Sequence, residues 1–294
     1  MRNLKKYLLL SAISLAFASC SNDDDAPVAN NVILSFKNTF GDTEIVLGGA
    51  ASASATVNTS DAGQVHRFSE LKYVISNIRL VKADGTEVPY NANDLDKGAM
   101  VVDQSKAASL NYVMGNIPSG EYRQIKFGLG VRSDLNALDQ ARFPNFYATA
   151  GANDTQMMWE WGTGYRFTKI EGFYDADSKE MSIHTGSTVQ GTDNDPSTYT
   201  QGVDAYRNIV LDLTQNAVVG SNAPKITIKA DFDKLLSGQS NTITLISTDE
   251  GHNGQGNATP SIHSAVQMVK FVDNLGGNGT TNPTGMFSII EVKN

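Results

Sequence analysis

Residues Val65 to Lys82 read VHRFSELKYVISNIRLVK, a long run rich in β-branched and aromatic residues of the kind that form strands. The run is followed at once by Ala83-Asp84-Gly85, and the Asp-Gly dipeptide is typical of a tight hairpin turn. A second extended run, 86–90, comes directly after the turn. This stretch therefore predicts a β-hairpin.

Similar short alternating runs recur along the chain, separated by Gly, Asn, Asp and Ser. The spacing is typical of an all-β protein, and no internal repeat or long low-complexity linker divides the chain. Besides the hairpin, we expect strands at 32–37, 43–47, 100–103, 120–131, 158–174, 180–185, 206–213, 225–230, 242–247 and 286–292.

Helical patterns are few. The clearest is 260–274, where apolar residues recur at three- and four-residue intervals before Gly276 and Gly277. Shorter helical turns are expected at 133–140 and 231–236, and loops at 145–155 and 186–202. The predicted fold class is therefore all-β, a single β-sandwich-like domain with short helical insertions, spanning residues 32–294.

The N-terminus has the pattern of a bacterial lipoprotein leader. Basic residues precede an apolar stretch that is too short for a permanent membrane span of about 20 residues. The segment Phe17-Ala18-Ser19-Cys20 resembles a lipobox, and Cys20 is the only cysteine of the chain. We expect residues 1–19 to be a signal peptide and Cys20 to be lipidated, which anchors the protein to a membrane.

Residues 20–31 are expected to form an acidic tether, because Asp23, Asp24 and Asp25 cannot pack in a core. The run also resembles the export signal of surface-exposed lipoproteins, so either a plain spacer or an address for the outer face of the outer membrane fits. Removing residues 1–19 takes away three positive charges and moves the formal net charge from −8 to −11. An acidic chain without a basic cluster is not expected to bind nucleic acid. Its negative net charge is better suited to the capture of a cation.

Both tryptophans lie in one segment, Met157-Met158-Trp159-Glu160-Trp161-Gly162-Thr163-Gly164. If this segment is a strand, Trp159 and Trp161 project on the same side and form one aromatic surface. That surface is either core packing, the ordinary role of large aromatics, or a functional site.

The four histidines are candidate metal ligands, and none is convincing alone. His184 is the best placed, because it ends a strand that is predicted to pair with the segment after the tryptophans. His252 and His263 flank the start of the late helical pattern, and His66 lies in the long strand.

Several segments together resemble the MbnP-like copper-binding proteins, a family named after a periplasmic protein associated with methanobactin. They are FSELKYVISNIRLVKADG (68–85), IPSGEYRQIKFGLGV (117–131), MMWEWGTGYRFTKIEG (157–172) and SIHTG (182–186). The segment with the tryptophans is the most specific of the four.

The resemblance implies a secreted β-sandwich that holds copper through histidine nitrogens and a tryptophan oxidised to kynurenine. Trp159 or Trp161 matches the modified residue and His184 matches a ligand, while His66, His252 and His263 are further candidate ligands. The oxidation resembles the work of a separate di-haem, peroxidase-like partner.

Without a metal, the sequence fits either a purely structural envelope lipoprotein or a surface recognition module. A surface recognition module without metal would use the paired indoles as a platform for a glycan or a peptide. Catalysis is not expected, because the chain lacks a nucleophile elbow, a free cysteine nucleophile and a Gly-rich phosphate loop after a strand.

Overall fold

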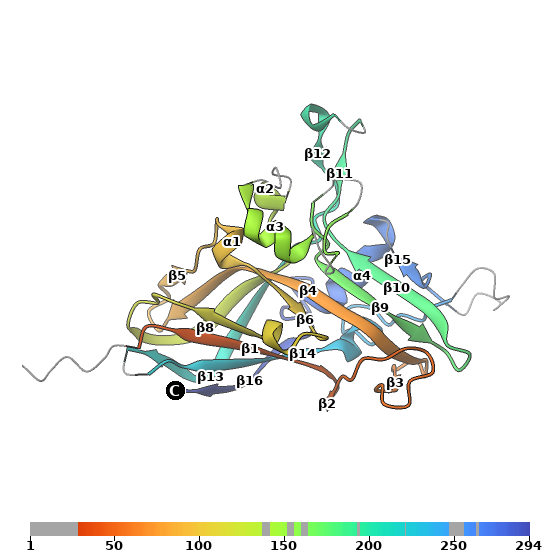
Figure 1. The fold of residues 1–294 in the computed structure, drawn as a ribbon, viewed down its shortest axis with the longest axis horizontal. Helices are drawn as coiled ribbons and strands as arrows, with labels where there is room; N and C mark the ends of the chain where they lie inside the picture. The colour runs from red at the N-terminus through yellow and green to blue at the C-terminus, as the bar shows by residue number, and fades with distance from the viewer. Residues whose placement is uncertain are drawn as a thin grey trace, which may run out of the picture.

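The computed structural model describes residues 29–136, 142–151, 156–159, 164–192, 195–220, 222–246, 256–262 and 265–294. These residues form two main sheets packed face to face, with short helices at the margins (Figure 1). The predicted all-β, sandwich-like fold class is therefore confirmed.

The larger sheet has nine strands among the described residues. They are β3 (Asn58–Thr59), β4 (Val65–Lys82), β5 (Glu87–Pro89), β6 (Met100–Asp103), β8 (Gly120–Leu129), β9 (Thr168–Tyr174), β10 (Lys179–Thr185), β13 (Arg207–Val219) and β15 (Ser261–Ile262).

The smaller sheet has five strands within the same described ranges. They are β1 (Val32–Phe40), β2 (Thr43–Glu44), β7 (Asn111–Met114), β14 (Lys225–Asp231) and β16 (Phe287–Lys293). A separate hairpin of β11 (Val189–Gln190) and β12 (Thr200–Gln201) projects away from both sheets (Figure 1).

The helices are short, and α1 and α3 contact each other beside β4 and β6. The α-helices are α1 (Leu95–Gly98), α2 (Ser133–Asn136), α3 (Pro144–Ala150) and α4 (Ala265–Gly276), and the 3-10 helices are η1 (Ala107–Leu110), η3 (Pro196–Thr198) and η4 (Phe232–Leu235). No helix in the described parts of the chain is both long and apolar enough to cross a membrane.

The core lies between the sheets and is rich in aromatic rings. Phe36 of β1 contacts Tyr73 of β4 and Phe127 of β8 edge-on, and Phe127 packs against Phe287 of β16 at 5.1 Å between ring centroids. The Tyr73 hydroxyl donates a 2.8 Å hydrogen bond to the Asn38 side chain, which satisfies both buried groups. Alternation along β1 and its neighbours supplies this core because every second side chain faces inward.

β4 organises the larger sheet. Its first half pairs with β9 and its second half with β8, all antiparallel, and register shifts at three points allow this change of partner. One shift lies between Ser76 and Arg79, where Asn77 has a φ of 53°. The predicted hairpin is present as well, because β4 pairs antiparallel with β5 around Gly85, whose φ is 88°.

Some sequence expectations need correction. The strand expected at 158–174 begins only at Thr168, and the one expected at 242–247 is reduced to isolated bridges at Thr242 and Leu245. The loop expected at 145–155 contains α3, and the helix expected from residue 260 begins at Ala265, because Ser261 and Ile262 are paired as β15 instead. At β15, tertiary pairing with β10 overrides the local helical pattern.

The expected tether meets the folded part earlier than predicted. Ala29 forms a bridge with Gly220, and the Asn30 carbonyl accepts a hydrogen bond from the Ile117 amide. The leader, Cys20 and the acidic run Asp23–Asp25 lie outside the described residues.

Candidate functional site

His184 lies near the end of β10, on the face of the larger sheet that points away from the smaller sheet. In the antiparallel β9–β10 pair, His184 is opposite Lys169 and Ser182 is opposite Glu171. Directly opposed residues share a face, so these four side chains form one polar surface. The residues between them, Ile170 and Ile183, are fully buried in the core.

The chain doubles back beside this surface. Met158 and Tyr165 form an antiparallel bridge, and the Trp159 amide donates to the Gly164 carbonyl at 3.2 Å. Gly164 has a φ of 93°, a conformation that residues with a Cβ rarely adopt. This turn, rather than one continuous strand, places Trp159.

The indole of Trp159 is enclosed between three groups. Its ring centroid lies 6.1 Å from that of His184, and the Arg166 guanidinium lies 4.9 Å from the indole centroid. Gly186 closes the pocket, because a Cβ there would lie only 2.9 Å from the indole Nε1. Trp159 is consequently 4% exposed.

A carboxylate holds the imidazole of His184. Its Nε2 lies 2.5 Å from Oε1 of Glu171, and the Ser182 hydroxyl also donates to that oxygen, at 3.1 Å. Burial acts to raise the pKa of Glu171, but its bonds to His184 and Ser182 and the charge of Lys169 outweigh burial and lower the pKa. The lowered pKa favours the ionised form of Glu171 beside the imidazole.

Charged side chains continue the polar surface across β9 and β4. Lys169 contacts both oxygens of Glu70 at 2.9 Å, and Lys72 contacts Glu70 at 2.6 Å and Asp103 at 3.8 Å. We call Glu70, Lys72, Asp103, Lys169 and Glu171 the charged ladder. Lys72, Lys169 and Asp103 are each more than nine-tenths buried, so the ladder is a partly desolvated ion network.

The ladder also reaches the tryptophan segment. The Lys169 ammonium lies 3.2 Å from the side-chain oxygen of Gln156, and Arg166 donates to the backbone carbonyl of Gln156 at 2.6 Å. Gln156 thus connects the charged ladder to the guanidinium of Arg166, which lies over the indole of Trp159.

His66 lies elsewhere. It is opposite Tyr174 in the β4–β9 pair, five positions along β9 from the partner of His184, so the two histidines occupy opposite faces of the same sheet. Its ring is packed between Phe40 and Phe68 in the core and is 1% exposed. The structure therefore does not bring His66 to His184.

Trp161, His252 and His263 lie outside the described residues. The described segment before His263 lies along the strand of His184, because Ser261 and Ile262 (β15) pair in parallel with Ser182 and Ile183 of β10. Ile183 and Ile262 are the residues directly before the two histidines.

A family model for MbnP matches residues 29–263. The chain belongs to the MbnP family. The structure is similar to that of MbnP from Methylosinus trichosporium, with a TM-score of 0.55 and 16% identity over 89% of this chain and 98% of that chain. At 16% sequence identity, this similarity shows a shared fold and nothing finer. Among curated proteins, no sequence matched the chain.

The MbnP fold raises the question of whether the residues present suit copper. Imidazole nitrogen is a good copper donor, and His184 supplies one with a carboxylate behind it. Within the ranges that the structure describes, however, no three His, Cys, Asp or Glu side chains are grouped to hold a metal. His184 supplies one donor suited to copper, the unmodified indole of Trp159 supplies none, and the described residues on their own do not make a complete copper site.

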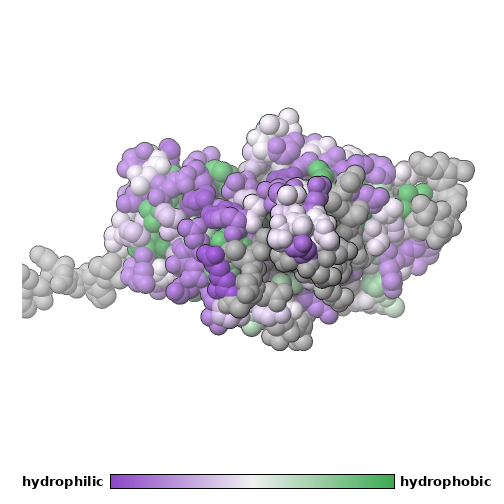
Figure 2. All heavy atoms as spheres, turned by 90° about the horizontal axis from the view of Figure 1, so that it is seen from above, coloured by the Kyte–Doolittle hydropathy of each residue, from purple (hydrophilic) through white to green (hydrophobic). Residues whose placement is uncertain are grey.

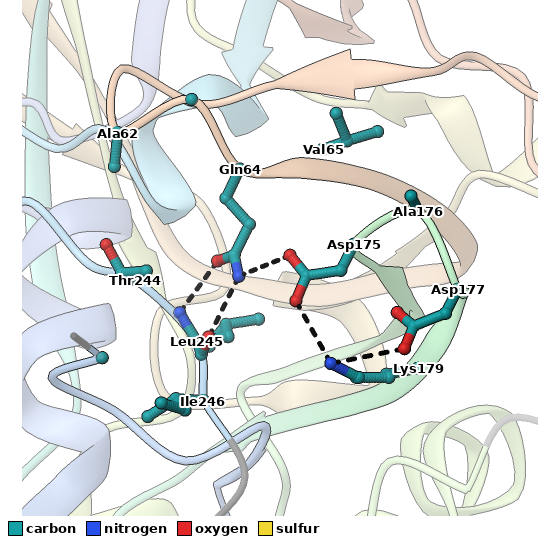
Figure 3. Close-up of a pocket in the computed structure, with 12 residues that line it drawn as sticks. Ala62, Gln64, Val65, Asp175, Ala176, Asp177, Lys179, Thr244, Leu245 and Ile246 are labelled. Atoms are coloured by element: carbon teal, nitrogen blue, oxygen red, sulfur yellow. Dashed lines mark hydrogen bonds and ion pairs between the residues drawn. The ribbon is translucent and has the colours of Figure 1, made fainter. Parts of the chain in front are cut away.

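Two open pockets flank β10. One of about 430 Å³ is lined by Glu171 and Ser182, the two side chains that bond to His184. The other, of about 620 Å³, lies at the far end of the β9–β10 hairpin (Figure 3). There Gln64 bonds to Asp175 and to both backbone groups of Leu245, so its polar atoms are satisfied within the fold.

The structure does not favour an aromatic recognition platform at Trp159, since a buried indole cannot stack on a glycan. The coloured residues of the face seen from above are mostly hydrophilic (Figure 2). Among the residues that the structure describes, the exposed large apolar side chains are single residues on separate segments, namely Val46, Val57, Val113, Val210 and Ile290.

The sequence alone did not identify Glu171, the rest of the charged ladder or Arg166 as neighbours of His184 and Trp159. A signal for Glu171 was present, because the predicted pairing of 158–174 with 180–185 places Lys169 and Glu171 opposite His184 and Ser182. Arg166 could not be found in this way, because the turn at Gly164 that brings it over Trp159 is not visible in a strand pattern.

Proposed function

We propose that this protein is a lipid-anchored, extracytoplasmic copper-binding protein that captures or stores the ion in the cell envelope. The site is built around His184 and Trp159, with His263 as a second histidine ligand. Copper is its cargo, and the proposal includes no catalytic activity.

The observation that carries this proposal is the packing of Trp159 against His184 at 6.1 Å in a member of the MbnP family. Two further findings support it. β15 leads the chain to His263 from a position paired with Ile183, and the carboxylate of Glu171 orients the imidazole of His184.

The lipid anchor on Cys20 and a place at the outer membrane follow from the leader and the acidic tether. A partner that oxidises Trp159 or Trp161 to kynurenine, of the di-haem peroxidase type, is the remaining part of the proposal. An oxidised indole adds an amine and a carbonyl, which supplies a donor that the described residues lack.

Copper titration of the full-length protein tests the site. We expect one ion per chain, and we expect His184→Ala and His263→Ala each to weaken binding by at least about 100-fold, because each removes a ligand. Peptide mass mapping of protein isolated from native membranes tests whether a tryptophan carries added oxygen.

His66→Leu is the matched control, because it also removes one histidine but on the opposite face of the sheet. It should leave copper affinity unchanged within about 2-fold. Equal loss of affinity in all three variants, or no binding by the unaltered protein, would refute the proposed site.

A further inference from the structure

We propose that Lys72 and Asp103 of the charged ladder join in an amide bond between their side chains, and that the folded protein forms this isopeptide bond without an enzyme or a cofactor. The bond cross-links β4 to β6 within the larger sheet. Strand register, burial and the contacts of the two side chains point to it, and copper plays no part.

Strand register places the two reacting groups side by side. Lys72 and Asp103 are directly opposed in the antiparallel β4–β6 pair. Directly opposed residues point to the same face of a sheet, with Cβ atoms about 4.5–5.5 Å apart. The Lys72 ammonium accordingly lies 3.8 Å from Oδ2 of Asp103. The backbone of two strands therefore holds amine and carboxyl together, which supplies the proximity that the same reaction lacks between free molecules in water.

Both side chains are removed from water. The side chain of Lys72 is 8% exposed and that of Asp103 is 2% exposed. Oδ2 of Asp103 is buried and has no hydrogen-bond partner among the described residues. Lys106 also lies 3.8 Å from this oxygen, but its side chain is 53% exposed and therefore solvated. A buried oxygen without a hydrogen bond is costly, and the condensation removes it, because this oxygen leaves as water.

The neighbouring groups suit an attack of the amine on the carboxyl carbon. Ser105 donates to Oδ1 of Asp103 from its backbone amide at 2.9 Å and from its hydroxyl at 2.6 Å. Two donors on one oxygen stabilise the negative charge that develops there during the attack. On the other side, Oε1 of Glu70 lies 2.6 Å from the Lys72 ammonium, within reach of its proton. Nucleophile, electrophile and base thus meet in one largely buried group.

The reaction balances without a further reagent. A proton first moves from the Lys72 ammonium to Oδ2 of Asp103, and loss of hydration favours the uncharged amine and acid that result. Nζ of Lys72 then forms a bond to Cγ of Asp103, and Oδ1 takes the electron pair of the C=O bond. Glu70 takes a proton from Nζ and passes it to Oδ2. Oδ2 leaves as water while the C=O bond forms again.

A short carboxylate–lysine contact is not sufficient by itself. Glu87 also lies 2.6 Å from a lysine, Lys126, but these side chains are 41% and 27% exposed. An exposed ion pair stays hydrated and charged, so its amine does not become a nucleophile. The Lys72 site differs in its burial and in the second carboxyl group that Asp103 presents to the same amine.

Peptide mass mapping of the unaltered, full-length protein tests the bond. Trypsin does not cleave after an acylated lysine, so Lys72 should remain uncut within the peptide 68–79, and Asp103 lies in the tryptic peptide 98–106. We expect these two peptides in one species whose mass is their sum minus one water, with fragmentation placing the link at Lys72 and Asp103. The protein is denatured before digestion, so that an ion pair cannot hold the peptides together.

Two variants and a matched control extend the test. Lys72→Arg keeps the positive charge and should abolish the joined species. Glu70→Gln should lower its yield at least about 10-fold at the same time after synthesis, because the variant lacks the base. Glu87→Gln also removes a carboxylate 2.6 Å from a lysine, and it should leave the yield unchanged.

Separate peptides 68–72 and 98–106 from the unaltered protein would overturn the inference, and so would a link through a lysine other than Lys72. An undiminished yield in Glu70→Gln would contradict the role of Glu70 as the base. The measurement on the unaltered protein decides whether the bond exists even if a variant does not fold.

Discussion

At the scale of single residues, His66 shows how strongly burial changes the behaviour of a side chain. Burial among aromatic rings lowers its pKa from 6.5 to about 4, and a weak bond from Nδ1 to the Gln64 carbonyl at 3.4 Å offsets only part of this. Its Nε2 is buried without a hydrogen-bond partner among the residues that the structure describes. His66 is therefore a neutral core residue at physiological pH.

This pKa makes the fold sensitive to acid. Between pH 6.5 and about 4 the unfolded chain binds the His66 proton and the folded protein does not, so stability falls as pH falls through that window. The free energy of unfolding is unaffected above pH 6.5 and is lowered by about 3 kcal/mol near pH 4. Urea unfolding at a series of pH values should show this slope.

His66→Leu should flatten the slope, because the variant has no proton to bind at this position. The carboxylates of the protein titrate equally in both forms and cancel in the comparison. An identical pH dependence in the two proteins would show that His66 is solvated and does not control acid stability.

At the scale of elements, the turn at Gly164 sets the position of Trp159. A Cβ on Gly164 would lie 2.6 Å from the backbone oxygen and the side chain of Asn136. The same Asn136 side chain accepts a hydrogen bond from the Tyr165 amide at 2.9 Å. α2 and the tryptophan segment are therefore fitted closely around a residue without a side chain.

Gly164→Ala should destabilise the protein by about 1–2 kcal/mol for the positive φ and by a further 1–3 kcal/mol, roughly, for the clash with Asn136. Copper affinity should fall as well, because Trp159 is paired with residue 164. Urea unfolding and copper titration measure the two effects.

Gly85→Ala separates the two contributions. Gly85 has a similar φ of 88° but nothing within 4 Å of the added Cβ. The Gly85→Ala variant should lose only the stability that the positive φ costs, about 1–2 kcal/mol, and should leave copper binding unchanged. Equal losses in both variants would mean that Asn136 moves aside at little cost.

At the scale of the whole molecule, the domain continues beyond the family match, which ends at residue 263. α4 packs on β10 and β13, and β16 pairs with β14. Phe287 of β16 contacts Phe127 and Tyr73 of the larger sheet. The C-terminal strand is thus part of the same core and not an appendage.

A protein that ends at Gly285 should therefore not fold. The truncation removes β16, exposes the edge of β14 and leaves the space of Phe287 empty, and loss of a buried Phe side chain alone costs about 3–5 kcal/mol. Circular dichroism and thermal unfolding should show no cooperative transition. Removal of Asn294 alone is the control, and it should keep a single transition. A folded protein ending at Gly285 would show that the core closes without β16.

The sequence by itself determined the fold class, the long strand β4 with its hairpin turn, and the family. These depend on residue type and period along the chain, which are local properties. It also singled out Trp159 and His184, which the structure places in contact.

Only the tertiary structure decided which groups meet. It separated His66 from His184 by the two faces of one sheet, turned the chain back at Gly164, and placed Glu171 and Arg166 against the two predicted residues. Side-chain partners depend on strand register and on turns that reverse the chain, and a one-residue difference in either moves a side chain to the opposite face.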